Sequence, residues 1–194
     1  HQILEDIGLM KMLPGMTVIN TCDYNQTKAA TISISFHSGP VYLRFGRPKV
    51  PNFTDPNQNF TIGKGIKLIQ GNDVTIVATG HLVWEAIESC KRLKEEGIFA
   101  ELINIHTIKP LDDEIILKSI SKTKCIVSAE EHNIIGGLGE SISGVLVRNN
   151  LVPMEFVGVE DSFGESGTPT QLMQKYGLSS NNIYEKCKRV ILRK

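Results

Sequence analysis

Apolar positions after residue 72 follow two alternating patterns, short continuous apolar runs and longer amphipathic stretches. Residues 73–80 (DVTIVATG) form a mainly apolar run, which is typical of a strand buried on both faces. In residues 81–97, apolar side chains recur on one helical face, at Val83, Ala86, Ile87, Cys90 and Leu93. Gly97 fits the left-handed position that ends a helix. The pattern therefore predicts a strand followed by a helix.

The same alternation continues to residue 194. Further strands are predicted at residues 98–106, 124–130 and 154–160, and further helices at residues 111–120, 137–149, 168–177 and 180–194. Thr168 and Ser180 are the expected N-caps of the last two helices, and Gly177 is the expected stop between them. Strands that alternate with helices predict an α/β fold, with a mostly parallel sheet covered by helices on both faces.

The first 50 residues form a smaller unit. A helix and two strands are predicted there, at residues 1–15, 16–20 and 40–46. Such a unit buries too little surface to fold alone, so we expect its domain to begin upstream of His1.

Residues 31–36 (TISISF) leave two interpretations open. Their apolar side chains alternate with a period of two, which predicts a strand. Asp23 is a good N-cap, and the alanines at residues 29–30 favour a helix over the same segment.

A proline-rich break separates the two units. It contains three prolines, several asparagines and two glycines within residues 48–65. Proline removes backbone donors and asparagine favours turns, so this segment predicts a linker or long loop. We therefore expect a first domain, a linker and a second domain at residues 1–50, 51–65 and 66–194.

Composition excludes two classes of function. The 194 residues carry 21 basic and 21 acidic side chains, and this balance argues against a nucleic-acid surface. No apolar run approaches the roughly 20 residues that a membrane span needs.

The cysteines, at positions 22, 90, 125 and 187, stand too far apart for a CxxC metal or redox motif. Scattered cysteines in apolar surroundings are typical of reduced, buried residues in a cytoplasmic protein.

Residues 126–146 raise the question of a nucleotide site, because a strand pattern leads through a glycine-rich turn into a helix. A dinucleotide fingerprint needs G-x-G-x-x-G, but Ile142 stands where the third glycine belongs after Gly137 and Gly139. The two carboxylates in residues 130–132 (Glu-Glu-His) would also repel the negative charge of a pyrophosphate. We therefore expect the glycines to serve packing. Residues 130–132 either form hydrogen bonds across a subunit contact or end the strand in solvent.

Three histidines remain, at positions 37, 81 and 106. His81, before a helix, and His106, after a strand, have no acidic or cysteine neighbour at metal-ligand spacing, so we expect structural roles and no metal site in this chain.

Three motifs, in this order and spacing, resemble the C-terminal part of transketolase. They are residues 107–120 (TIKPLDDEIILKSI), 127–142 (VSAEEHNIIGGLGESI) and 163–178 (FGESGTPTQLMQKYGL). The last is similar to split transketolases, in which two subunits make up the enzyme. Residues 1–19 are similar to a run late in the pyrimidine-binding domain of the family. The resemblance covers the whole chain and implies a partial pyrimidine-binding-type α/β domain followed by a transketolase C-terminal domain.

The resemblance implies two site residues. His1 matches the histidine of the family's THQ motif. In the family this histidine faces the reacting hydroxyls of the donor sugar, so the match implies a catalytic role for His1. Arg47 matches the arginine that holds the terminal phosphate of the sugar, for which a planar guanidinium is suited. Arg44, three residues earlier, is expected to form a structural ion pair instead.

The resemblance also implies transfer of a two-carbon ketol unit between sugar phosphates, with thiamine diphosphate and Mg²⁺ in the complete enzyme. None of the family's cofactor contacts falls on this chain. We therefore expect no catalysis without an N-terminal transketolase half or subunit, and we expect homodimer contacts as well. The alternatives are a non-catalytic assembly domain, or the equivalent part of a deoxyxylulose-phosphate synthase or of a 2-oxo-acid dehydrogenase beta subunit.

Overall fold

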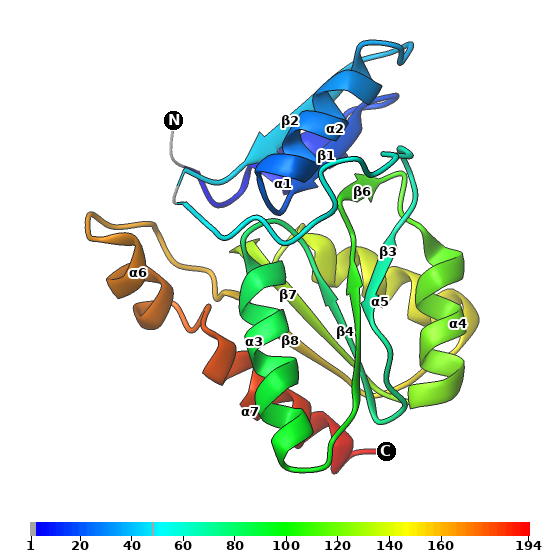
Figure 1. Ribbon diagram of the computed structural model, residues 1–194, viewed down its shortest axis with the longest axis vertical. Coiled ribbons are helices and arrows are strands. Elements are labelled where there is room, and N and C mark those ends of the chain that lie inside the picture. The colour runs from blue at the N-terminus through cyan, green and yellow to red at the C-terminus, as the bar shows by residue number, and fades with distance from the viewer. Residues whose placement is uncertain (1–2, 48) are drawn as a thin grey trace.

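The computed structural model describes residues 3–47 and 49–194, and His1 lies outside these residues. A small α/β unit sits at one end of a larger one, and the chain crosses between them through residues 46–65, which contain no helix or strand in their described part (Figure 1). The strands are β1 (Thr17–Thr21), β2 (Val41–Phe45), β3 (Ile66–Ile69), β4 (Val74–Ala78), β5 (Ala100–Asn104), β6 (Thr107–Lys109), β7 (Ile126–Asn133) and β8 (Met154–Val159). The helices are α1 (Asp6–Lys11), α2 (Tyr24–Ile34), α3 (Leu82–Glu95), α4 (Asp113–Thr123), α5 (Leu138–Asn149), α6 (Pro169–Lys175) and α7 (Ser180–Ile191).

The larger unit is built on a five-stranded sheet with the order β3-β5-β4-β7-β8. Its strands pair in parallel, except for β3, which runs antiparallel to β5 at one edge. The mostly parallel sheet predicted from the alternating pattern is therefore confirmed. The two short strands β3 and β6 were not predicted.

Helices cover both faces of this sheet. Along β4, Ile76 packs with α3 and α7, whereas the next residue, Val77, packs with α4 and α5. Both side chains are fully buried. Successive strand residues point to opposite faces, so a run of apolar residues can fill two cores at once.

The smaller unit has a three-stranded sheet with the order β2-β1-β6. β1 and β2 are parallel, and β6, which comes from the chain after β5, is antiparallel to β1. Ile7, Val18 and Ile108 form the buried core of this unit. The domain division given above stays a prediction, but β6 ties the first 47 residues firmly to the later part of the chain.

The two interpretations of residues 31–36 are resolved in favour of a helix. α2 runs through Ile34, and Asp23 caps it, because the carboxylate accepts a hydrogen bond from the N–H of Gln26 at 2.8 Å. The period-two pattern was misleading because this part of α2 is mostly solvent-exposed and has no strong apolar face to specify.

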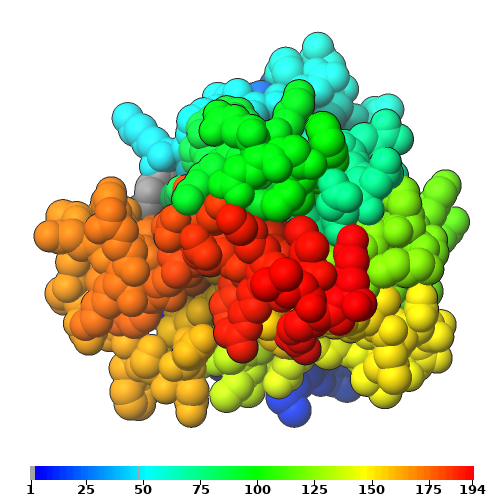
Figure 2. Space-filling model, turned by 90° about the horizontal axis from the view of Figure 1, so that it is seen from below, coloured from blue at the N-terminus to red at the C-terminus, as the bar shows by residue number. Residues whose placement is uncertain are grey.

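The C-terminal helices follow the predicted order with one changed cap. Thr168 caps α6 as predicted, and Gly177 has the positive φ of 68° that a helix stop favours. The N-cap of α7 is Ser179 and not Ser180, since the Ser179 hydroxyl accepts the hydrogen bond from Asn182. α7 lies beside α3 across one face of the molecule, and α6 stands at the edge of that face (Figure 2).

All four cysteines are free and buried, as predicted. None of the helices in the described residues combines the length and the apolar composition that crossing a bilayer requires.

Candidate functional site

The carboxyl ends of β1 and β2 open onto a cleft of about 440 Å³, called the strand-end cleft below. Its walls come from the start of α2, from the loop after β2 and from the residue before α3. Among the lining residues are Thr21, Tyr24, Phe45, Lys49, Asn52 and His81. Ligands of parallel α/β sheets bind outside the carboxyl ends of the strands, so this cleft is the candidate site.

Asp23 holds the walls of the strand-end cleft together. Its side chain is almost fully buried, and its two oxygens accept four hydrogen bonds. One comes from the N–H of Gln26 in α2, and the others come from the Phe53 N–H and from the N–H and hydroxyl of Thr54, at 2.7–2.9 Å. Because these bonds satisfy both carboxylate oxygens, Asp23 organises the cleft and has no acceptor position left for a ligand.

The sequence-predicted phosphate ligand lies beside this cleft. Arg47 follows Gly46, which lines the cleft, and its side chain is exposed. Lys49, two residues later, lines the cleft itself. Arg44 is bound elsewhere: its Nε donates to Asp6 at 2.9 Å, which confirms the predicted structural ion pair.

The same Asp6 oxygen also accepts the hydroxyl of Tyr42 at 2.7 Å. Burial, together with this carboxylate, raises the pKa of Tyr42 to about 12. Arg44 continues the network by donating to the carbonyl oxygen of Glu131 at 2.9 Å. These contacts join α1, β2 and β7, so Arg44 stabilises the junction of the two units.

The side chains around the cleft do not suit the magnesium diphosphate of a thiamine cofactor. In the described ranges, no group of three His, Cys, Asp or Glu side chains could hold a metal ion. The carboxylate of Asp23 already accepts hydrogen bonds from within the chain. The residues present therefore do not fit the metal, whereas the cationic groups at the cleft suit an anionic group of a ligand.

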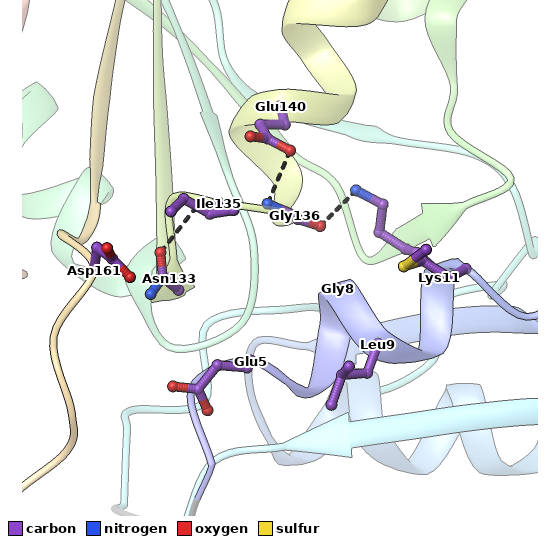
Figure 3. A pocket seen from close by; sticks show the side chains of 10 residues that line it. Glu5, Gly8, Leu9, Lys11, Asn133, Ile135, Gly136, Glu140 and Asp161 are labelled. Carbon is purple, nitrogen blue, oxygen red and sulfur yellow. Dashed lines mark hydrogen bonds between the residues drawn. The ribbon is translucent and has the colours of Figure 1, made fainter.

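A second cleft, of about 520 Å³, lies between α1 and the turn that joins β7 to α5 (Figure 3). Leu9 and Ile135 contribute apolar surface to it. Lys11 bridges it, since its ammonium donates to the carbonyl oxygens of Gly136 and Gly137 at 2.7 and 2.8 Å. Partial burial lowers the pKa of Lys11. The two hydrogen bonds of Lys11 join α1 to the glycine turn.

The glycine turn serves packing, as predicted. The carboxylate of Glu130 accepts the N–H groups of Leu138 and Gly139 at 2.6 and 2.8 Å and so fills the N-terminus of α5. A Cβ at Gly137 would lie 2.1 Å from this carboxylate, and one at Gly139 would lie 2.5 Å from the ring of Phe156. A protein carboxylate therefore occupies the place that a nucleotide phosphate would need.

The expectation of a strand end in solvent is wrong for Glu130 and His132, which are fully buried and form hydrogen bonds within the chain. The expectation of hydrogen bonds across a subunit contact stays a prediction. His132 Nε2 accepts the N–H of Gly8 at 3.2 Å, and its Nδ1 lies 2.6 Å from the carbonyl oxygen of Asn133. Burial lowers the pKa of His132. The neutral ring thus joins β7 to α1.

The other histidines differ in role. His106 is buried beside Phe60, with ring centroids 4.0 Å apart, and burial lowers its pKa to about 4, in line with a structural residue. His37 lies 3.3 Å from the hydroxyl of Thr17. His81 lines the strand-end cleft, and its expected structural role stays a prediction.

Sequence reasoning missed Lys49 and His81 as candidate ligands. A signal for His81 was present, since it closely follows the buried run of β4, at the end of a parallel strand where ligand-binding residues gather. Lys49 gave no comparable signal, because a lysine in a proline-rich loop is ordinary.

The structure thus defines an α/β protein with a mostly parallel sheet and a cleft at strand ends of its smaller unit that Lys49 lines. The model of the family "Transketolase, C-terminal domain" matches residues 63–183, and the chain therefore belongs to this family. The family resemblance inferred from the three sequence motifs is confirmed.

Similar proteins include subunits of split enzymes. The chain is 42% identical over 194 residues to the 6-deoxy-6-sulfo-D-fructose transketolase subunit SqwH of Clostridium sp., covering 100% of this chain and 60% of that protein. It is 34% identical over 184 residues to a subunit of the apulose-4-phosphate transketolase of Phocaeicola vulgatus, covering 94% and 59%. The chain thus spans about 60% of the length of these curated relatives.

A solved structure described as a split gene transketolase, an inactive beta4 tetramer, superimposes with a TM-score of 0.97 at 41% identity, covering 100% of this chain and 64% of that one. Another relative is 1-deoxy-D-xylulose-5-phosphate synthase 1 of Geobacter sulfurreducens. It is 34% identical over 188 residues, which cover 94% of this chain and 29% of that enzyme.

Proposed function

We propose that this protein is the C-terminal portion of a transketolase and helps to move a two-carbon ketol unit from a ketose phosphate to an aldose phosphate. The observation that carries the proposal is the strand-end cleft, lined by Lys49 and next in sequence to Arg47, in a member of the transketolase C-terminal domain family. The names of two similar subunits supply further support, since each refers to a sugar with an acidic group.

Arg47 holds the terminal phosphate of the sugar in this proposal. Its side chain is exposed beside the cleft and, in the described part of the chain, forms no ion pair. A guanidinium in that state can donate two parallel hydrogen bonds to phosphate oxygens. His1 has the catalytic role at the reacting hydroxyls, where it holds or moves a proton.

Thiamine diphosphate with Mg²⁺ supplies the electron sink for the transferred carbons when it is bound. The described side chains do not fit the metal, so we assign its site and that of the diphosphate to an N-terminal transketolase half or subunit. The role of this chain is to bind and orient the sugar and to complete the enclosed site.

An N-terminal subunit is therefore the proposed partner, together with a second copy of this chain. The two similar proteins that are named as transketolase subunits support the first partner, and the beta4 tetramer of the similar structure supports contacts between copies. The four buried free cysteines fit the reducing cytoplasm, which is the proposed location.

Reconstituted ketol transfer tests the proposal. The full-length protein is mixed with its N-terminal partner, thiamine diphosphate and Mg²⁺, and product formation is followed from a ketose phosphate and an aldose phosphate. We expect turnover with the mixture and none with either protein alone. Condensation of pyruvate with an aldehyde, without ketol transfer, would instead assign the chain to a deoxyxylulose-phosphate synthase. Absence of both activities would leave only an assembly role.

A further inference from the structure

Lys49 is the cation that lines the strand-end cleft itself. Its side chain is exposed, and its ammonium forms no ion pair with any described residue. The acid among the lining residues, Asp23, already accepts four hydrogen bonds from the chain. These donors are neutral, and in the described part of the chain Asp23 forms no ion pair with Lys49, so the Lys49 ammonium is available to an anionic group of a ligand.

His81 faces the same cleft from the larger unit. It stands directly before α3, its side chain is half-buried, and it does not cap the helix. The N-terminus of this 14-residue helix therefore keeps the positive end of its dipole at the cleft. An imidazole N–H is a suitable hydrogen-bond donor to an oxyanion in a cleft that also holds an ammonium group.

Since the two residues come from different units, the cleft depends on how those units are joined. Lys49 belongs to the loop after β2, which Asp23 fixes through Phe53 and Thr54, and the ring of Phe53 packs on Trp84 of α3 with centroids 5.7 Å apart. These contacts hold residues 53–54, at the later part of the Lys49 loop, against the start of α3.

We propose that Lys49 and His81 together bind the tetrahedral anionic end group of the sugar, a phosphate or a sulfonate, so that the larger unit contributes directly to substrate recognition. This inference rests on the proposed function and deepens it. It adds an ammonium inside the cleft to Arg47 at the edge, and it makes His81 a specificity residue of the C-terminal domain. Neither residue should increase the affinity for a sugar without a charged end group.

Kinetics of the complete enzyme test this proposal. Lys49→Gln should raise the KM for ketoses with a terminal phosphate or sulfonate by roughly tenfold to hundredfold, with kcat and the KM of a neutral ketose unchanged. Lys49→Arg should restore most of the loss, and His81→Ala should raise the same KM by roughly threefold to tenfold. Lys118→Gln, an exposed lysine on α4, is the matched control and should behave as wild type. Equal changes for charged and neutral ketoses, or no change, would overturn the proposal.

A second measurement does not depend on turnover. Acetylation of individual lysines in the full-length protein is followed by mass spectrometry, with inorganic phosphate or sulfate against chloride at equal ionic strength. We expect several-fold slower acetylation of Lys49 and an unchanged rate at Lys118. Protection by phosphate but not by sulfate would identify a site for a phosphate end group. Protection by both would show that the site also takes a sulfonate. Protection without ketol transfer would refute the proposed function and keep the anion site, whereas unprotected Lys49 would refute the anion site itself.

Discussion

Replacing Arg47 by alanine in the complete enzyme should raise the KM for phosphorylated ketoses by roughly tenfold to hundredfold, because a charge-assisted bidentate contact is lost. The KM for an unphosphorylated ketol donor should stay within about twofold of wild type. Steady-state kinetics with both donors give the comparison. An effect confined to the phosphorylated sugar identifies a group that contacts phosphate and not the reacting carbons.

Two further variants sharpen this result. Arg47→Lys keeps the charge but loses the planar fork, so we expect an intermediate KM. Arg148→Ala removes another exposed arginine, at the end of α5, and should leave both KM values unchanged. If Arg47→Ala weakened both donors equally, the phosphate role would have to be abandoned.

Stability should fall with rising pH in a way that depends on Glu130. Burial raises the pKa of this carboxyl to about 7, although two backbone N–H groups and the charges of Lys11 and Arg44 act in the opposite direction. The unfolded chain has the ordinary carboxyl pKa, close to 4.5. Between these values the folded protein binds more protons than the unfolded chain, so this stabilising contribution is complete below pH 4.5 and is lost as pH rises through 7.

The size of this effect follows from the difference between the two pKa values. It amounts to about 3 kcal/mol of unfolding free energy, at about 1.4 kcal/mol for each pKa unit. Urea unfolding of wild type and Glu130→Gln between about pH 5 and pH 8 measures it. We expect the free-energy difference between the two proteins to change by most of that amount over this pH range, whereas Glu95→Gln, at an exposed site on α3, should follow wild type. Parallel curves for wild type and Glu130→Gln would show that this carboxyl titrates normally.

The sequence predicted the larger unit well because its signals are local. A continuous apolar run such as β4 can fill two cores, and a helix such as α3 carries its apolar stripe at fixed spacing. β3 and β6 escaped prediction since strands of four and three residues have no period to detect. Their pairing is specified by the tertiary fold.

The candidate site was less predictable for a related reason. Arg47 was found only through a motif resemblance, and Lys49 gained its significance when the chain brought it to the same cleft as His81, which is 32 residues away in sequence. The Glu130 carboxylate likewise revealed its role only once the turn had folded back on β7. Long-range contacts of this kind leave no periodic trace in a single sequence.

In the proposed enzyme, this chain supplies the sugar side of the active site and its partner supplies the metal and diphosphate side. Isothermal titration calorimetry with thiamine diphosphate and Mg²⁺ is the decisive measurement of this division. We predict no tight binding to this protein alone and Mg²⁺-dependent binding once the N-terminal partner is added. Tight, Mg²⁺-dependent binding to this protein without the partner would refute the division.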